Sequence, residues 1–528
     1  MDIRGTWQRA LTHRWARIGL ALAAGLAAGL AHPPFNIWPG LLGYPVLMLL
    51  AAHSVRVRGA FWMGWLFGFA YFFIGCWWVA EAFFVNPAQA WMAPIAVSAL
   101  PAGIGLFTGL ATLAYRALKL RGPWRFLAFV LAFSALEWVR GHILTGFPWN
   151  PVGASWKAGS AMSQIASVVG VYGLGLLTLL GIAAFAPVMT QPRNRTAQSV
   201  ALFGLAVLMA MLGFGNGRLS NARVEDSPVL ARIVQADVSQ ESKWSADAYQ
   251  QILNRYLTLT SQPAERTPDV VIWPESALPD LANNILAGPD AVQIAAALTE
   301  GQTLLTGLSR AQRQPDGKVV YFNSLIELNS LGVRGMQVGQ TYDKYRLVPF
   351  GEYLPLGELM GSLGIRRIVQ MPEDLSAGPR PEPLVLARLP KVQPLICYES
   401  LFPGFVDGTA QGRPDWIVNV SNDAWFGQTS GPTQHLNMAS YRAIETGLPI
   451  ARATPTGISA MIDPLGRIVE GSRIGHGEAK VVDVFVPKPL LPTVFGRFGH
   501  LPFGAGLLIL GVLVAVLRWR PNIRGSEY

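Results

Sequence analysis

Charged residues are scarce in this chain of 528 residues, and cysteines are scarcer still. Asp, Glu, Lys and Arg together make up 14% of the sequence, while 51% of it is hydrophobic. A soluble globular protein has about a quarter of its residues charged. The scarcity is uneven, because charge is sparse before residue 216 and ordinary from 219 to 488. This distribution excludes a wholly soluble protein and predicts a membrane part joined to a soluble domain.

Only two cysteines are present, Cys76 and Cys397. Cys76 lies inside the apolar run 61–79, so we expect it in the bilayer and out of reach of Cys397. This excludes a disulfide framework. The sequence also lacks a cluster of His, Cys and carboxylates with metal-ligand spacing, and it lacks a phosphate-binding glycine loop. We therefore predict no metal, no nucleotide and no other cofactor.

The net charge of +10 is the kind of excess that nucleic-acid-binding proteins carry. Here, however, many basic residues fall in short clusters beside apolar runs, which is the positive-inside pattern of membrane topology. Since no nucleic-acid-binding motif is present either, we predict no nucleic-acid partner. The clusters are Arg4, Arg9, Arg14 and Arg17; Arg56 and Arg58; Arg116, Lys119, Arg121 and Arg125; Arg193 and Arg195; and Arg518, Arg520 and Arg524.

Eight apolar runs approach the length of about 20 residues that a membrane-spanning helix needs. The first two are short, and a helical hairpin that dips into the bilayer is the alternative for them. The runs cover residues 17–31, 38–53, 59–79, 90–118, 124–143, 162–189, 196–214 and 503–517.

The basic clusters orient these runs. With a cytoplasmic N-terminus, the clusters all fall inside, and the loops 33–39 and 81–89, which contain no Lys or Arg, fall outside. Arg218 and Arg223 count mildly against this orientation. Seven spans before the polar segment place that segment outside the cytoplasm. We predict a seven-span domain at 1–216, a polar domain at 219–488, and a last span with a cytoplasmic tail at 489–528.

The polar segment alternates β-branched runs with helical patterns. This alternation predicts an α/β domain that buries its own core. We expect strands at 229–238, 269–273, 303–308, 322–328, 392–397, 415–420, 457–462 and 479–486, and helices at 246–261 and 433–446.

Three polar motifs follow or adjoin these strands: IWPES at 272–276, YDKYRLVPFGEYLP at 342–355 and QPLICYES at 393–400. The last contains Cys397 at the end of an apolar run, as expected of a nucleophile at the end of a buried strand. A thiol becomes a good nucleophile when a nearby base takes its proton or a cation lowers its pKa. A carboxylate and an ammonium in one site supply both functions.

Together these motifs resemble the Glu-Lys-Cys site of the nitrilase, or carbon–nitrogen hydrolase, superfamily. With a nitrilase-like domain between seven spans and one, the chain resembles the apolipoprotein N-acyltransferase family. The resemblance covers essentially the whole chain and shows no departure at the catalytic positions. It rests on WPES, DKYRLVPFGEYLP, ICYES and SNDAWFG, and on HPPF at 32–35, GFPW at 146–149 and RATPTGI at 452–458.

The resemblance implies a polytopic α-helical membrane domain and a periplasmic αββα sandwich in a bacterial inner membrane. It implies that Glu275 is the general base, that Lys344 stabilises the oxyanion and that Cys397 is the acylated nucleophile. Supporting roles fall to Glu352, Tyr398 and Glu399. Trp244 matches a tryptophan at the active-site entrance, and we expect Trp425 and Phe426 to face lipid.

Each residue also has a plainer interpretation. A buried cysteine is often an inert small hydrophobe. Glu275 after a proline is typical of a helix start, and Lys344 beside Asp343 is typical of a solvated ion pair. The alternative for Trp244 is core packing. Asn422 and Asp423 are also typical of a turn, although we favour structural support near the thiol for them. We interpret His435, which lies in a run with helical spacing, as structural.

The implied reaction has two steps. A phospholipid gives an acyl chain to Cys397 as a thioester, and the α-amino group of a diacylglyceryl-modified lipoprotein then takes it. We expect a monomer. One alternative is a membrane-anchored amidase that uses water as acceptor, and another is a non-enzymatic transporter or assembly factor.

The segment 354–371 is unusually apolar for a domain surface. It carries Arg366 and Arg367 beside Leu359, Met360, Leu363 and Ile365. A mobile lid that enters the lipid interface is one interpretation, and an ordinary core helix is the other.

Overall fold

The computed structural model describes residues 11–241, 243, 248–355, 357, 374–405 and 412–519. The chain forms two compact units. One combines residues 1–80, 91–222 and 498–528, and the other combines residues 81–90 and 223–497. Residues 81–90, which include the short helix α5 (Glu81–Phe84), therefore belong to the second unit, although in sequence they lie between helices of the first.

The first unit is helical, and each of the eight predicted apolar runs contains a helix. Within the described residues, five helical stretches are long and apolar enough to cross a membrane, namely Val57–Phe84, Pro87–Ala117, Ala161–Thr190, Arg195–Asn221 and Leu501–Trp519. The count of seven spans before the polar segment stays a prediction. The helices are α2 (Arg14–Gly29), α3 (Gly43–Ala52), α4 (Val57–Cys76), α6 (Ala93–Ala117), α7 (Phe126–Arg140), α8 (Ala166–Ala183), α9 (Ala186–Thr190), α10 (Arg195–Asn221) and α18 (Leu501–Trp519).

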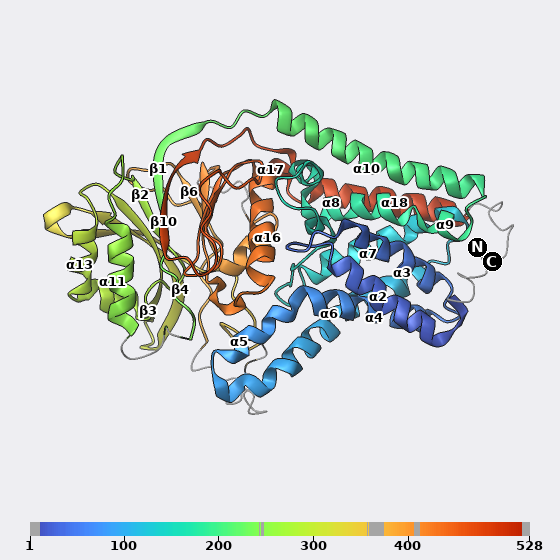
Figure 1. The fold of residues 1–528 in the computed structure, drawn as a ribbon, viewed down its shortest axis with the longest axis horizontal. Coiled ribbons are helices and arrows are strands. Elements are labelled where there is room, and N and C mark those ends of the chain that lie inside the picture. The colour runs from blue at the N-terminus through green and yellow to red at the C-terminus, as the bar shows by residue number, and fades with distance from the viewer. Residues whose placement is uncertain are drawn as a thin grey trace. The chain divides into compact units, whose positions relative to one another are not determined.

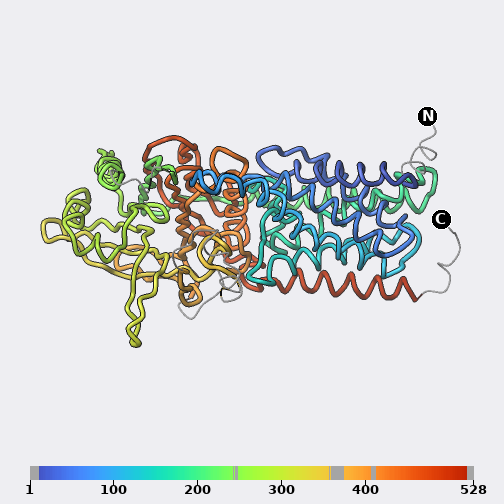
Figure 2. Tube along the Cα trace, turned by 90° about the horizontal axis from the view of Figure 1, so that it is seen from below, coloured from blue at the N-terminus to red at the C-terminus, as the bar shows by residue number. Residues whose placement is uncertain are grey.

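The long helices of this unit run alongside one another (Figures 1 and 2). Close approach of α4 and α6 depends on small residues, since a Cβ atom on Gly68 would lie 2.9 Å from the Cα atom of Gly105. The start of α2 and the end of α18 lie at one end of the bundle, while α10 ends and α18 begins at the other (Figure 2).

Buried polar contacts bring two of the sequence motifs together inside the helical unit. His32 Nε2 lies 2.5 Å from the Tyr71 hydroxyl, which donates to the Asn150 carbonyl at 2.9 Å. Arg140 Nη1 donates to the Trp149 carbonyl at 2.8 Å. Polar groups buried away from water need such partners, so these bonds hold HPPF and GFPW in place.

The second unit has two β-sheets. The larger has the order β10-β1-β2-β3-β4-β5 and the smaller β6-β7-β8-β9. The strands are β1 (Asp226–Gln235), β2 (Val270–Trp273), β3 (Thr303–Arg313), β4 (Val319–Ser330), β5 (Met336–Asp343), β6 (Val392–Ile396), β7 (Trp416–Val420), β8 (Ile450–Ala453), β9 (Ala460–Ile462) and β10 (Lys480–Pro487).

The two sheets pack face to face between helices, which confirms the αββα sandwich. One apolar core, which includes Ile272 and Val418, joins the inner faces of the sheets. A second core joins the outer face of the larger sheet to α11 (Ala248–Thr260), α12 (Ala282–Ala287) and α13 (Asp290–Ala297). The long helix α16 (Gly431–Thr446) lies on the side of the smaller sheet (Figure 1).

The parallel strands explain where the polar motifs meet. β1, β2 and β3 are mutually parallel, as are β6, β7 and β8. β2 and β6 are buried along their whole length, as expected of near-continuous apolar runs. Because parallel strands end at the same edge of a sheet, the residues that follow them are brought together.

Several elements differ from the prediction. The strands β5 and β8 and the helices α12 and α13 were not predicted, β3 and β4 are longer than expected, and β9 is shorter. β5 is an edge strand with mostly exposed side chains, so its sequence lacks apolar alternation. β8 is only four residues long and has Arg452 within it, so it is too short and too polar to signal a buried strand.

Candidate active site

Cys397 lies at a sharp turn between β6 and the 3₁₀ helix η9 (Cys397–Leu401). Its backbone φ is 50°, a left-handed conformation that costs free energy for a residue with a side chain. The turn lifts the thiol off the end of a fully buried strand. The residue as a whole is partly accessible.

Glu275 is positioned by the matching edge of the other sheet. It follows β2 after Pro274, and the next residue, Ser276, also has a left-handed φ of 48°. Its side chain is buried. Oε1 accepts hydrogen bonds from Asn323 Nδ2 at 2.6 Å and from Lys344 Nζ at 3.3 Å. Oε2 is buried and has no hydrogen-bond partner among the described residues.

Lys344 follows β5 and is buried between two carboxylates. Its Nζ lies 2.9 Å from Glu352 Oε1 and 3.3 Å from Glu275 Oε1. The neighbouring Asp343 points to the opposite face, where it binds Arg310 and Ser324. Because side chains alternate along a strand, the interpretation of Lys344 as a solvated partner of Asp343 is wrong.

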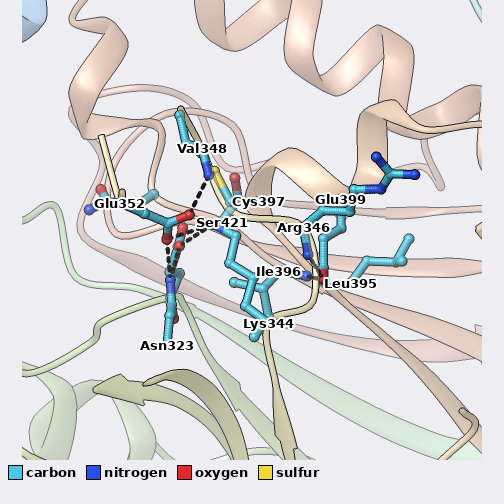
Figure 3. A network of polar contacts seen from close by, with 12 residues as sticks. Asn323, Lys344, Arg346, Val348, Glu352, Leu395, Ile396, Cys397, Glu399 and Ser421 are labelled. Carbon is cyan, nitrogen blue, oxygen red and sulfur yellow. Dashed lines mark hydrogen bonds and ion pairs between the residues drawn. The ribbon is translucent and has the colours of Figure 1, made fainter. Parts of the chain in front are cut away.

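Glu352 completes the polar centre of the site. Its Oε1 accepts from Lys344 and, at 3.0 Å, from Asn323 Nδ2, while its Oε2 accepts the Val348 backbone N–H at 2.8 Å. Figure 3 shows Lys344, Asn323 and Glu352 converging close to Cys397. Both oxygens of Glu352 are thus engaged, in contrast to those of Glu275.

Glu399 joins the nucleophile strand to the lysine loop. Its Oε2 accepts the Ile396 N–H at 2.7 Å, and its Oε1 accepts the Tyr342 hydroxyl at 2.7 Å and the Tyr345 N–H at 2.8 Å. Burial raises the pKa of Glu399 to about 7, against the opposing effect of these hydrogen bonds. Tyr398 is buried and packs edge-to-face on Phe402 at 5.1 Å.

Electrostatics keep the resting thiol neutral and the lysine charged. Burial, reinforced by the Glu275 charge, raises the pKa of Cys397 to about 12, although Lys344 and a hydrogen bond with Ser421 oppose the shift. Burial alone would lower the pKa of Lys344, but the carboxylates of Glu275 and Glu352 outweigh it and raise the pKa overall. A base must therefore remove the thiol proton as the sulfur attacks.

A second ammonium, that of Lys243, lies near Glu275. Its Nζ donates to the carbonyl of Ser276, the residue after Glu275. Burial lowers the pKa of Lys243 to about 8, against the opposing attraction of Glu275. The strained backbone at Ser276 is thus held by a buried cation.

A buried cluster supports the thiol from the side of the smaller sheet. Asp423 binds Arg452 Nη2 at 2.8 Å and His435 Nδ1 at 2.9 Å, and it accepts from Ser421 Oγ at 3.0 Å. His435 Nε2 lies 3.3 Å from the Cys397 carbonyl oxygen. His435 therefore contacts the backbone of Cys397, and its structural role stays a prediction.

The expected lipid-facing residues are placed only in part. Trp425 is 39% exposed, while Phe426 packs edge-to-face on His435 at 5.6 Å. Trp244 lies outside the described residues, and so does nearly all of the segment 354–371. Asn422 donates to Gln240 at 3.1 Å and so tethers this loop to the end of β1.

Sequence reasoning missed three polar residues at the site: Lys243, Asn323 and Ser421. Ser421 directly follows the buried strand β7, which is the same signal that identified Cys397. Asn323 and Lys243 are single polar residues without a pattern of their own, and only the fold brings them to the carboxylates.

Comparison with known proteins identifies the two domains of the chain. A strand-end cysteine with a buried lysine and carboxylate in an αββα sandwich defines a carbon–nitrogen hydrolase domain, and the Carbon-nitrogen hydrolase family model matches residues 230–487. The model of the Apolipoprotein N-acyltransferase N-terminal domain matches residues 24–184.

Full-length relatives narrow the assignment. A protein of Caulobacter vibrioides named apolipoprotein N-acyltransferase is 48% identical over 97% of both chains. One of the same name from Rhodopseudomonas palustris is 38% identical over 96% of both. The chain belongs to the apolipoprotein N-acyltransferase family. The structure of an amidase from Nesterenkonia sp. aligns with 51% of this chain and 94% of the amidase chain, at 19% sequence identity and a TM-score of 0.34.

Gly307 tests how tightly the backbone of Glu275 is fixed. A Cβ atom on Gly307 would lie 2.5 Å from Glu275 Cα and 2.7 Å from the Pro274 carbonyl oxygen, and backbone atoms there have little freedom to move. We expect Gly307→Ala to lose about 1–3 kcal/mol of stability and ~10²-fold in activity. Gly213→Ala, with nothing within 4 Å of its Cβ position, is the control. Wild-type activity in Gly307→Ala would show that Glu275 is not held by this contact.

Substitution of Asp423 tests how much the buried cluster of Asp423, Arg452 and His435 contributes to stability. Burial would raise its pKa, but Arg452 and His435 outweigh burial and hold it at about 2. Its contribution to stability is therefore present above the ordinary carboxylate pKa of about 4 and is lost as the pH falls toward 2. We expect Asp423→Asn to cost about 3 kcal/mol near neutral pH, since it leaves Arg452 buried and uncompensated.

Thermal unfolding of the detergent-solubilised chain measures this loss. The control is Glu225→Gln, which breaks the exposed pair with Lys488 and should cost within about 0.5 kcal/mol. Equal losses in the two variants would contradict a special role for the buried cluster.

Proposed function

We propose that this enzyme transfers an acyl chain from a membrane phospholipid to the α-amino group of a diacylglyceryl-modified lipoprotein, through a thioester on Cys397. One observation carries the proposal: the Glu275, Lys344 and Cys397 loops meet in a chain that also has five helices long enough to cross a membrane. Glu275 acts as the general base, Lys344 stabilises the oxyanion, and Cys397 is the nucleophile.

In the first half-reaction, Cys397 Sγ attacks the ester carbonyl of the phospholipid while Glu275 Oε2 takes the thiol proton. The carbonyl oxygen becomes a tetrahedral oxyanion beside the Lys344 ammonium, which is charged before substrate arrives. Collapse breaks the ester C–O bond. Glu275 returns its proton to the leaving oxygen, and a lysophospholipid departs from the thioester.

In the second half-reaction, the lipoprotein amine attacks the thioester carbonyl and Glu275 Oε2 accepts one of its protons. The C–S bond breaks, and the proton passes to the sulfur, so that the amide product leaves a neutral thiol. The raised pKa of Cys397 favours this return to the resting state. Glu352 anchors Lys344, while Tyr398 and Glu399 hold the nucleophile turn.

We propose three parts for the chain: seven spans at 1–216, the acyltransferase domain at 219–488, and a last span with its tail at 489–528. The acyltransferase domain is periplasmic and both termini are cytoplasmic. The start of α2 and the end of α18 lie at the same end of the helical bundle (Figure 2), which supports placing both termini on one side of the membrane. The positive-inside pattern supports the cytoplasmic side. Because Glu275, Lys344 and Cys397 all belong to one unit of a single chain, we propose a monomer.

Trp425 and Phe426 are proposed to contact the acyl chains of the substrates, with Trp244 at the entrance. The exposed indole of Trp425 supports this role, since large aromatic groups favour an interface with lipid.

Trapping the acyl-enzyme tests the proposal against its rivals. Incubation of the full chain with labelled phospholipid, without acceptor, should give a thioester on Cys397 that intact-mass measurement locates. Cys397→Ala should abolish the adduct, and Cys76→Ala, the control at the other cysteine, should retain it. Addition of a diacylglyceryl peptide should then release the label as amide.

The outcome separates three classes of protein. Turnover of small amides without any lipid adduct would favour the amidase that uses water. No adduct and no turnover would favour a non-enzymatic protein.

The pH dependence of thiol alkylation tests the base. A thiol with a pKa of about 12 that reacts only after free ionisation should react about tenfold faster per pH unit between pH 6 and 9. If Glu275 takes the proton, the iodoacetamide rate on Cys397 should instead be nearly flat over that range. Glu275→Gln should be slower by ~10²-fold or more and recover the steep slope.

The control for this experiment is Glu327→Gln. Glu327 is a buried carboxylate elsewhere on β4, bound to Asn329 and Gln340, so its loss should leave the alkylation profile flat. A steep profile in the wild-type chain would rule out Glu275 as the base.

A further inference from the structure

Asn323 touches both carboxylates of the site and has no assigned role. It projects from β4, is 4% exposed, and donates from Nδ2 to Glu275 Oε1 at 2.6 Å and to Glu352 Oε1 at 3.0 Å. Both hydrogens of its amide nitrogen are therefore used on two anions at once. Figure 3 shows the side chain of Asn323 directed toward Glu352.

The chemistry of the partners fixes the orientation of the amide. An ionised carboxylate only accepts hydrogen bonds, so the nitrogen and not the oxygen must face it. Asn323 Oδ1 is consequently left buried without a hydrogen-bond partner among the described residues. A buried unpaired oxygen costs free energy, and an apolar residue of the same shape would avoid that cost. The asparagine is thus retained for its donors.

Those donors act unequally on the two carboxylates. Glu352 has both oxygens engaged, because Oε2 accepts the Val348 N–H at 2.8 Å. Glu275 has both of its donors on Oε1 and none on Oε2 within the described residues. One carboxylate is therefore anchored at both oxygens, and the other keeps a single lone acceptor.

We propose that Asn323 is a positioning residue that holds Oε1 of Glu275 so that Oε2 is kept for the proton of the reacting thiol and, later, of the amine. The inference rests on the proposed function for the identity of the substrates, but not for the proton transfer itself. Without Asn323, the Lys344 ammonium would be the only donor shared by the two Oε1 atoms. Glu275 would then turn toward Lys344 and withdraw Oε2 from the thiol.

The charged and titratable groups around this point are Glu275, Glu352, Lys344, Lys243 and Cys397, together with Glu399, which interacts with Lys344, and Asp423, which interacts with Cys397. The neutral amide of Asn323 adds hydrogen-bond donors to this cluster without adding charge. An anion that loses a donor takes up a proton more readily. Loss of Asn323 should therefore move the acid side of the rate profile to higher pH.

The test measures alkylation of Cys397 by iodoacetamide in the full chain between pH 4.5 and 9, because this needs no lipid substrate. We expect Asn323→Leu to react ~10²-fold more slowly at pH 7, with its acid limb about one pH unit higher than in the wild type. Asn323→Ser, which keeps one donor, should fall between the two. The same order is expected for acyl-thioester formation from phospholipid.

The matched control is Asn329→Leu. Asn329 lies on the same strand and donates to the carboxylate of Glu327 at 2.9 Å, so its loss should leave both the rate and the acid limb unchanged. An acid limb that stays in place in Asn323→Leu, or a wild-type rate, would overturn the inference. If the leucine variant does not fold, the serine variant decides by the same two criteria.

The inference and the proposed function fail in different ways. A wild-type chain that is alkylated as expected but forms no lipid thioester contradicts the acyl donor and leaves the role of Asn323 standing. A wild-type chain that forms the lipid thioester, with an unshifted acid limb in Asn323→Leu and Asn323→Ser, contradicts only the role of Asn323.

Discussion

The buried ammonium of Lys344 is the interaction on which the rest of the site depends. A charge removed from water is tolerated only when it is paired and hydrogen-bonded, and here Glu275 and Glu352 supply that pairing at 3.3 Å and 2.9 Å. Neither carboxylate is stable in the interior without the cation. The three side chains are therefore coupled, and they come from two loops of the larger sheet: Glu275 follows β2, while Lys344 and Glu352 both follow β5.

Backbone strain is concentrated where these loops turn. Cys397 and Ser276 both adopt left-handed φ values, of 50° and 48°, which cost about 1–3 kcal/mol each for residues other than glycine. Buried polar side chains offset this cost locally. Glu399 binds the Ile396 N–H immediately before the nucleophile, and Lys243 binds the Ser276 carbonyl. Each strained turn is stabilised by a hydrogen bond between a neighbouring buried side chain and its backbone.

Burial also explains which parts of the site could be predicted from the sequence and which could not. Positions 275 and 397 stand out in the sequence because each lies at the end of a short, buried and mostly apolar strand, where a polar residue is conspicuous. The edge strand β5 could not be predicted, because its exposed side chains carry no alternation. Asn323, Lys243 and the partners of Asp423 are single polar residues in ordinary surroundings. Whether such a residue reaches the site depends on which strands pair in the sheet, and the hydrophobic periodicity of the sequence does not specify strand pairing.

The same burial also reconciles the nucleophile with its proposed location. A thiol outside the cytoplasm without a disulfide partner is at risk of oxidation, and the thiolate is the form that oxidises. Burial and the Glu275 charge raise the pKa of Cys397 to about 12, so almost no thiolate exists at rest. In the proposed mechanism, the sulfur becomes nucleophilic only when an electrophilic carbonyl arrives and the proton moves to Glu275. Protection of the thiol and the proposed catalysis would then be two consequences of one electrostatic arrangement.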